Sequence, residues 1–130
     1  MADIKYFPKK FSDVVQFDLN KNYTRENATL LKGNKYSLGD IVAQNAQGKI
    51  VPIDVSKEDG TQNFYGVFLS EDIDLTDEQE DKVVYGAILR NGPASVLENG
   101  LNYQTDDGEK KKAIKAAMEA AGIRVDVASI

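Results

Sequence analysis

The chain has 130 residues, a mass of 14.3 kDa and a formal net charge of −5. This length corresponds to one domain, and a hydrophobic content of 42% is enough for one core. Because the chain has no Cys and no His, disulfides, thiolate nucleophiles, zinc-finger sites and His-dependent catalytic triads are excluded. We therefore expect a protein that is not an enzyme and that uses no cofactor and no metal.

Hydropathy and charge also limit the partners. No apolar run approaches the length of about 18 residues that a membrane span needs, and the first residues lack the apolar region of a secretory signal. The negative charge is concentrated in residues 66–130, and an acidic surface repels phosphate backbones. We expect no membrane and no nucleic acid among the partners.

Residues 1–27 differ from the rest of the chain. They contain no Gly and no sustained hydrophobic period, yet they hold five aromatic residues out of a total of 6 Tyr and 5 Phe. A disordered tail is poor in aromatic residues because it has nothing to bury them in. The segment therefore either packs on its own domain or is an N-terminal arm that becomes ordered on a partner.

Residues 28–130 have the pattern of a single β-rich domain. Turn signals such as those at Gly33, Gly48 and Gly92-Pro93 separate short apolar segments. Pro52 cannot donate to a strand ladder, so we place it at a strand end or edge. The near-continuous apolar run 82–89 predicts a strand buried on both faces. The expected strands are 41–43, 49–53, 64–69, 82–89, 94–97, 101–103 and 123–127.

One helix of about 15 residues is predicted near the C-terminus, because Ala113, Ile114, Ala117, Met118 and Ala121 recur on one helical face. The spacing of Asp106 and Glu109 is that of an N-cap and the third helical residue, and Gly122 fits the closing position. The fold class is thus mainly β with one C-terminal helix (α+β). We expect a small mixed β-barrel or sandwich-like domain with an extended N-terminal arm.

Seven acidic residues and no basic residue lie within residues 71–81. Such a density of carboxylates is compatible with Ca²⁺ binding. An EF-hand loop starting at Asp72 fails, however, since it requires Gly and Glu where Asp77 and Val83 stand. We interpret the segment as a solvent-exposed loop between strands.

Three stretches, taken in their order along the chain, resemble the lambda-type bacteriophage head decoration (capsid cement) proteins. The first is an early hairpin, the second a strand followed by a polar turn, and the third a Lys-rich helix start, an Ala-Gly helix end and a β-rich tail. They are residues 38–42 with 48–52, residues 65–69 with 72–74, and residues 110–113 with 120–130.

This resemblance implies a virion protein that binds the outer surface of an expanded capsid as a homotrimer, after assembly in the host cytoplasm, and stabilises the shell. Its partners are then the major capsid protein and other copies of itself. The resemblance also implies that the arm of residues 1–27 contacts the capsid. The capsid-binding residues that we predict in this arm are Tyr6, Phe7, Phe11 and Phe17.

An alternative is a small β-barrel binding module that recognises a sugar, a peptide or another protein. The hairpin 41–53 is also loosely similar to biotinyl and lipoyl carrier domains, which carry a modified Lys at the hairpin tip. Here Lys49 lies one residue past the tip and lacks the flanking Met of those domains. A mass shift on Lys49 would identify a carrier domain.

Overall fold

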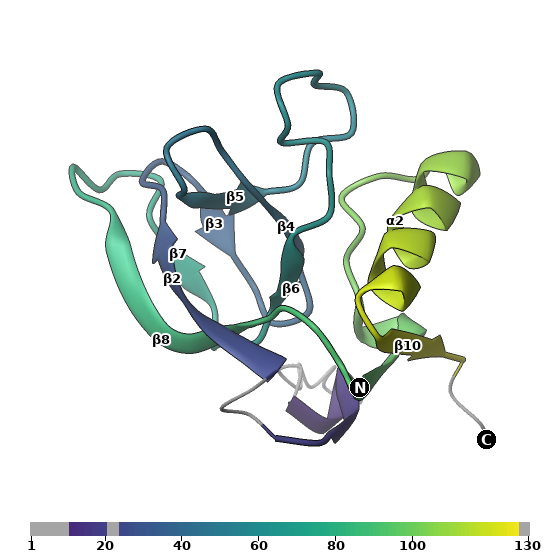
Figure 1. Cartoon of the computed structure of the whole chain (residues 1–130). Helices are drawn as coiled ribbons and strands as arrows, with labels where there is room; N and C mark the ends of the chain where they lie inside the picture. Colours follow the sequence, from purple (N-terminus) through teal and green to yellow (C-terminus); the bar gives the residue numbers. More distant parts are fainter. Residues whose placement is uncertain (1–10, 21–23, 128–130) are drawn as a thin grey trace, which may run out of the picture.

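The computed structural model describes residues 11–20 and 24–127, and their fold is mainly β with one C-terminal α-helix, as predicted (Figure 1). Five strands form a small closed barrel in the order β2-β5-β4-β6-β8. The barrel strands are β2 (Arg25–Leu30), β4 (Ile41–Gln44), β5 (Ile50–Pro52), β6 (Gly66–Phe68) and β8 (Lys82–Leu89).

The remaining elements cover the barrel. A 3-stranded sheet has the order β1-β9-β10, with β1 antiparallel and β10 parallel to β9. The helix α2 (Gly108–Ala120) lies beside the barrel and packs on β10 (Figure 1). The other elements are η1 (Phe11–Asp13), β1 (Val15–Asp18), β3 (Lys35–Tyr36), β7 (Ile73–Asp74), β9 (Ala94–Leu97), η2 (Glu98–Gly100) and β10 (Ile123–Asp126).

The predicted hairpin is confirmed in β4 and β5. These strands pair antiparallel, and the side-chain oxygen of Asn45 accepts hydrogen bonds from the backbone of Gln47 and Lys49 across the turn. Pro52 is the last residue of β5, where its missing N–H costs no ladder bond.

The helix is confirmed, but its predicted N-cap is wrong by one residue. Asp107, not Asp106, precedes the first helical residue, and its carboxylate accepts hydrogen bonds from the backbone N–H groups of Glu109 and Lys110 at 2.9 and 3.3 Å. A single carboxylate thus satisfies two amides that have no partner within the helix. At the other end, Gly122 has a φ of +86° and closes the helix as expected.

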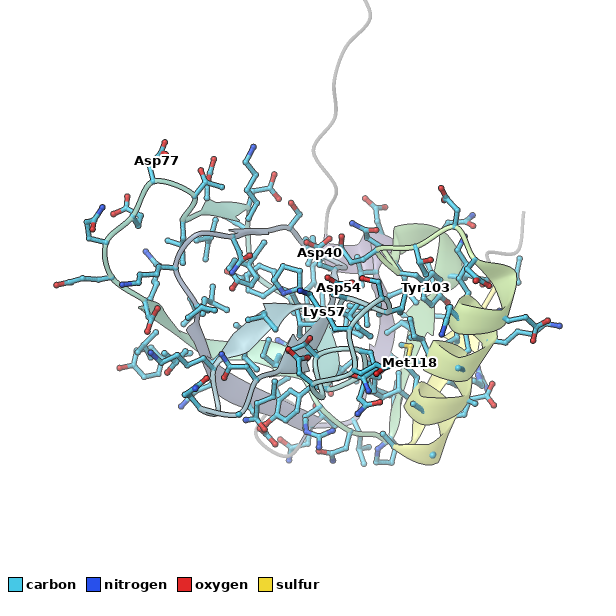
Figure 2. All side chains as sticks on the ribbon, turned by 90° about the horizontal axis from the view of Figure 1, so that it is seen from above. Asp40, Asp54, Lys57, Asp77, Tyr103 and Met118 are labelled. Atoms are coloured by element: carbon cyan, nitrogen blue, oxygen red, sulfur yellow. The ribbon has the colours of Figure 1, made fainter. Side chains whose placement is uncertain are left out.

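The barrel strands divide their side chains between two apolar clusters. The outer cluster includes residues of α2, β9 and β10, all of which lie outside the barrel, so it fills the space between the barrel wall and these elements; Met118 of α2 points into it (Figure 2). The inner cluster occupies the opposite face of the strands and therefore the barrel interior. It comprises Ala28, Leu30, Tyr36, Val42, Ile50, Phe68, Leu75, Ala87 and Ile88.

The prediction that strand 82–89 is buried on both faces is wrong for its first half. Ala87, Ile88 and Leu89 are buried, but Val83 is 52% exposed and Tyr85 is 79% exposed. The reason is that α2 and the 3-stranded sheet cover the barrel wall only near Leu89, whereas the earlier part of β8 extends past this cover (Figure 1).

Tyr36 packs in the inner cluster and also forms hydrogen bonds to the backbone next to β2 and in β5. The ring is fully buried and packs against Phe68 with 5.7 Å between the ring centroids. Its hydroxyl lies 2.8 Å from the carbonyl oxygen of Ile50 and 2.9 Å from that of Leu31. Burial of the hydroxyl raises the pKa of Tyr36 to about 12, because the phenolate would lose its hydration.

We expect Tyr36→Phe to lower the free energy of unfolding at neutral pH by about 1 kcal/mol through the lost hydrogen bond. The raised pKa gives a second effect: the unfolded chain ionises near pH 10 and the folded chain near 12. Wild-type stability should therefore fall, relative to the Phe variant, by about 1.4 kcal/mol per pH unit in this window. Urea unfolding of both proteins between pH 8 and about 11.5 measures this, and parallel pH profiles would contradict it.

Candidate interaction surface

The described part of the N-terminal segment is anchored in the outer cluster. Val14 is fully buried and Val15 is 7% exposed, and both belong to this cluster. The carbonyl of Val14 accepts a hydrogen bond of 2.8 Å from the backbone N–H of Leu97. Strand β1 then pairs with β9. Residues 11–20 are thus part of the folded domain.

A close backbone approach holds this anchor in place. A Cβ added to Gly100 would lie 2.1 Å from the carbonyl oxygen of Asp13 and 3.0 Å from the Cα of Val14. A Cβ added to Gly39 would in turn lie 2.0 Å from the carbonyl oxygen of Gly100. Glycine is therefore required where η1, η2 and the turn before β4 meet.

Immediately around this anchor the segment exposes large apolar side chains. Phe11 is 40%, Phe17 51% and Leu19 61% exposed. We call these three residues the arm-root surface. Phe17 lines a shallow hollow of about 240 Å³ together with Pro93 and Arg124. Exposed aromatic and aliphatic side chains beside such a hollow are typical of a protein–protein contact.

A small polar network fixes the shape of this region. The carboxylate of Asp18 accepts a hydrogen bond of 2.8 Å from Nε of Arg25 and another from the hydroxyl of the buried Thr24. The guanidinium of Arg25 also lies over the ring of Phe11, 4.8 Å from its centroid. The side chain of Phe11 is thus held against a rigid ion pair while part of its ring faces solvent.

The predicted capsid-binding residues divide into two groups. Phe11 and Phe17 lie on the arm-root surface, whereas Tyr6 and Phe7 lie outside the described residues. Leu19 is more exposed than either Phe residue but is not among the predicted residues, because only aromatic side chains were expected as anchors. The sequence carries one signal for it: the apolar Leu19 directly precedes the polar run Asn20–Asn22.

The acidic run 71–81 forms an exposed loop around β7, and Asp77 projects from it into solvent (Figure 2). A hydrogen bond from the hydroxyl of Thr76 holds the pKa of Asp74 below its ordinary value. Lys49, the residue compared with a carrier lysine, lies with its Nζ 2.5 Å from the carboxylate of Asp81 and lowers the pKa of that group. This ion pair ties the β4–β5 hairpin to the acidic loop.

The described residues also bear on metals and membranes. Within residues 11–20 and 24–127, no group of three or more Asp or Glu side chains is placed to hold a metal ion. In the same part of the chain, no helix is long and apolar enough to cross a membrane. The buried carboxylate of Asp40 has a structural role, since it accepts hydrogen bonds from Ser37 and Asn102.

Together these features define a class of protein: a small closed β-barrel whose anchored N-terminal strand exposes large apolar side chains. A search of curated proteins finds no match. The family model described as bacteriophage lambda head decoration protein D matches residues 4–123. Because this match covers almost the entire chain, the protein belongs to the lambda head decoration protein family.

Family membership confirms the resemblance that the sequence suggested. It identifies the chain as a structural phage protein with a role in decorating the capsid, and places it in the virion head. The family is not an enzyme family. Membership of this family also implies binding to the phage capsid. The arm-root surface is the candidate site for that contact.

The glycine contact under the arm root gives a direct test of its anchoring. We expect Gly100→Ala to lower the free energy of unfolding by about 1–3 kcal/mol, because the new methyl group displaces Asp13 and Val14. The control is Gly108→Ala, where an added Cβ meets nothing within 4 Å and the helix gains a better helix former. Urea unfolding of both variants measures the difference; equal effects would contradict the proposed crowding.

Proposed function

We propose that this protein binds the outer surface of an expanded phage capsid as a homotrimer, contacts the major capsid protein through its N-terminal arm, and stabilises the shell. The observation that carries this proposal is the combination of a buried anchor at Val14 and Val15 with exposed apolar side chains at Phe11, Phe17 and Leu19. Family membership supplies the class of partner.

The anchor matters for affinity. An arm that leaves the domain from a fixed point loses less conformational freedom on binding than one that leaves from a loose tail. Residues 1–10 lead directly into this point and carry the predicted contacts Tyr6 and Phe7. We therefore propose that residues 1–10 and the arm-root surface bind the capsid as one continuous segment.

Stabilisation of the shell then follows from mass action. A ligand that binds the expanded lattice better than its precursor shifts the equilibrium towards the expanded form. A trimer presents three arms to one lattice, so modest affinities for each arm combine into high avidity. Assembly in the host cytoplasm and location on the outer surface of the virion are parts of the same proposal.

The test is co-sedimentation with expanded capsids formed from the major capsid protein of the same phage. We expect Phe17→Ser and Leu19→Ser each to raise the apparent dissociation constant by about tenfold or more, because each removes an apolar anchor worth about 2 kcal/mol. Deletion of residues 1–10 should weaken binding further. A deletion extending to residue 20 would be uninformative, since it removes the buried Val14 and Val15.

Gln47→Ser serves as the matched control, because Gln47 is exposed in the β4–β5 turn, away from the arm root. Each variant is first compared with the wild type by thermal unfolding. If both arm-root variants bind expanded capsids as tightly as Gln47→Ser does, the proposed contact is wrong. If the wild type binds unexpanded and expanded capsids equally, the proposed stabilisation is wrong.

A further inference from the structure

The exposed part of β8 is shaped by a bulge. Glu26 pairs with Ile88 and Ala28 with Val84, so residues 85–87 of β8 lie opposite Asn27 alone. Gly86 has a φ of +61°, and its N–H donates a 2.8 Å hydrogen bond to the side-chain oxygen of Asn27. β-Bulges change the direction of side chains and are common at the rims of barrels and beside functional sites. Tyr85 is one of the bulged residues, and its side chain is exposed to solvent.

Tyr85 and Val83 together form an apolar projection on the outer wall of the barrel, which we call the β8 knob. Val84, between them, packs against the inner cluster, so the two flanking side chains point outward. They are 79% and 52% exposed. Neither buried cluster includes them, which means that the fold itself does not need these side chains to be apolar.

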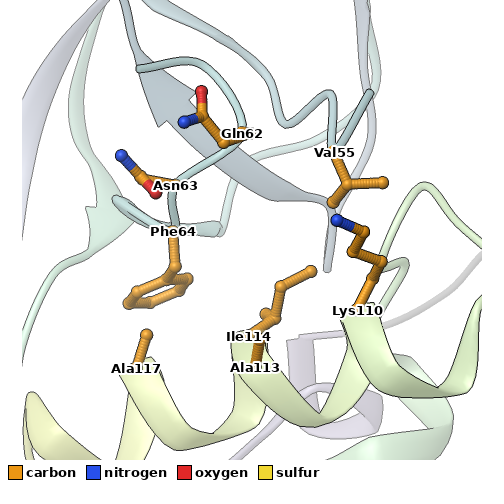
Figure 3. Close-up of a pocket in the computed structure, with 8 residues that line it drawn as sticks. All are labelled: Val55, Gln62, Asn63, Phe64, Lys110, Ala113, Ile114 and Ala117. Carbon is orange, nitrogen blue, oxygen red and sulfur yellow. The ribbon is translucent and has the colours of Figure 1, made fainter. Parts of the chain in front are cut away.

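A largely apolar hollow lies against α2, and we call it the α2 groove. It has a volume of about 280 Å³ and lies between the helix and the segment before β6. Phe64 and Ile114 point into it, with Lys110 at its edge (Figure 3). The lining residues are Val55, Gln62, Asn63, Phe64, Lys110, Ala113, Ile114 and Ala117.

Charge distinguishes the two surfaces. Lys110 is the sole charged residue among those that line the α2 groove, and it forms no ion pair with any residue in the described part of the chain. The exposed Lys82 directly precedes the β8 knob, and before it lies the acidic loop, in which the exposed Asp77, Glu78 and Glu80 likewise have no described ion-pair partner. The acidic loop before the knob thus complements Lys110 at the edge of the groove.

The two surfaces also lie on different sides of the molecule. The exposed half of β8 is at one side of the barrel and α2 is at the other, so one chain cannot bring its own knob to its own groove (Figure 1). Two different patches that complement each other between copies form a heterologous contact, and heterologous contacts close into rings when the rotation allows it.

We propose that the β8 knob of one copy inserts into the α2 groove of the next copy, and that this head-to-tail contact builds the homotrimer; the inference rests on the proposed function. Tyr85 is the anchor, because a Tyr ring fills an apolar pocket while its hydroxyl keeps a polar partner. Lys110, Gln62 and Asn63 supply such partners at the groove.

Two variants test this from opposite sides of the contact. Tyr85→Ser removes the knob, and Ala117→Arg fills the groove from a partly exposed helix position where Arg is a good helix former. We expect light scattering to give about three times the chain mass of 14.3 kDa for the wild type and for Gln47→Ser. Each of the two variants should give a single chain mass, with unchanged circular dichroism.

Mixing the two variants is the decisive measurement. The Ala117→Arg chain keeps its knob and the Tyr85→Ser chain keeps its groove, so the mixture should form a species of two chains and no larger one. Single variants that remain trimeric, a mixture that stays at one chain mass, or a wild type that is monomeric at every concentration would each overturn the inference. Co-sedimentation of the wild type with capsids judges the proposed function separately.

Discussion

Packing on both faces of the barrel strands is the constraint on which this fold depends. A closed barrel has no free edge, but each strand must then satisfy an inner and an outer environment with alternate residues. In β4, Val42 faces the inner cluster while Ile41 and Ala43 face the outer one. The barrel alone buries only the first set, so α2 and the 3-stranded sheet are needed to bury the second.

The barrel strands are closely packed where β6 pairs with β8. A Cβ on Gly66 would lie 2.3 Å from a methyl carbon of Ile88 and 2.8 Å from the carbonyl oxygen of Leu89. The outer cluster is equally demanding, since it takes Val14 and Val15 from the N-terminal segment. The anchor of the arm is therefore a consequence of barrel closure: the segment that leads to the predicted capsid contacts also completes the core.

Much of this fold could be predicted from local patterns. The hairpin with Pro52 at its end, the amphipathic helix and the closing Gly122 all depend on neighbours in the sequence, and all are confirmed. What could not be predicted depends on distant contacts. The apolar run 82–89 has the pattern of a buried strand, and only the position of α2 decides that Val83 and Tyr85 remain uncovered. Gly86 within that run was the available signal of a bulge.

The same reasoning applies to the candidate site. The many aromatic residues of the N-terminal segment indicate that it packs against a protein surface. The sequence alone leaves two alternatives for that surface, the segment's own domain or a partner. Self-packing is confirmed for Val14 and Val15, which pack inward. Phe17 and Leu19 face solvent, and docking through them stays a prediction. Whether a side chain points inward is set by its pairing with β9, which lies about 80 residues further along the chain.

A protein that must join copies of itself and also bind a lattice needs two surfaces that do not compete. In the proposed assembly, the β8 knob and the α2 groove serve the first contact, and the arm-root surface serves the second. Both surfaces rest on the same apolar packing, because the outer cluster contains both Val14 at the arm root and Ile114 beneath the groove. Ordering of one surface on binding would then stiffen the support of the other, so that trimer formation and shell binding would favour each other.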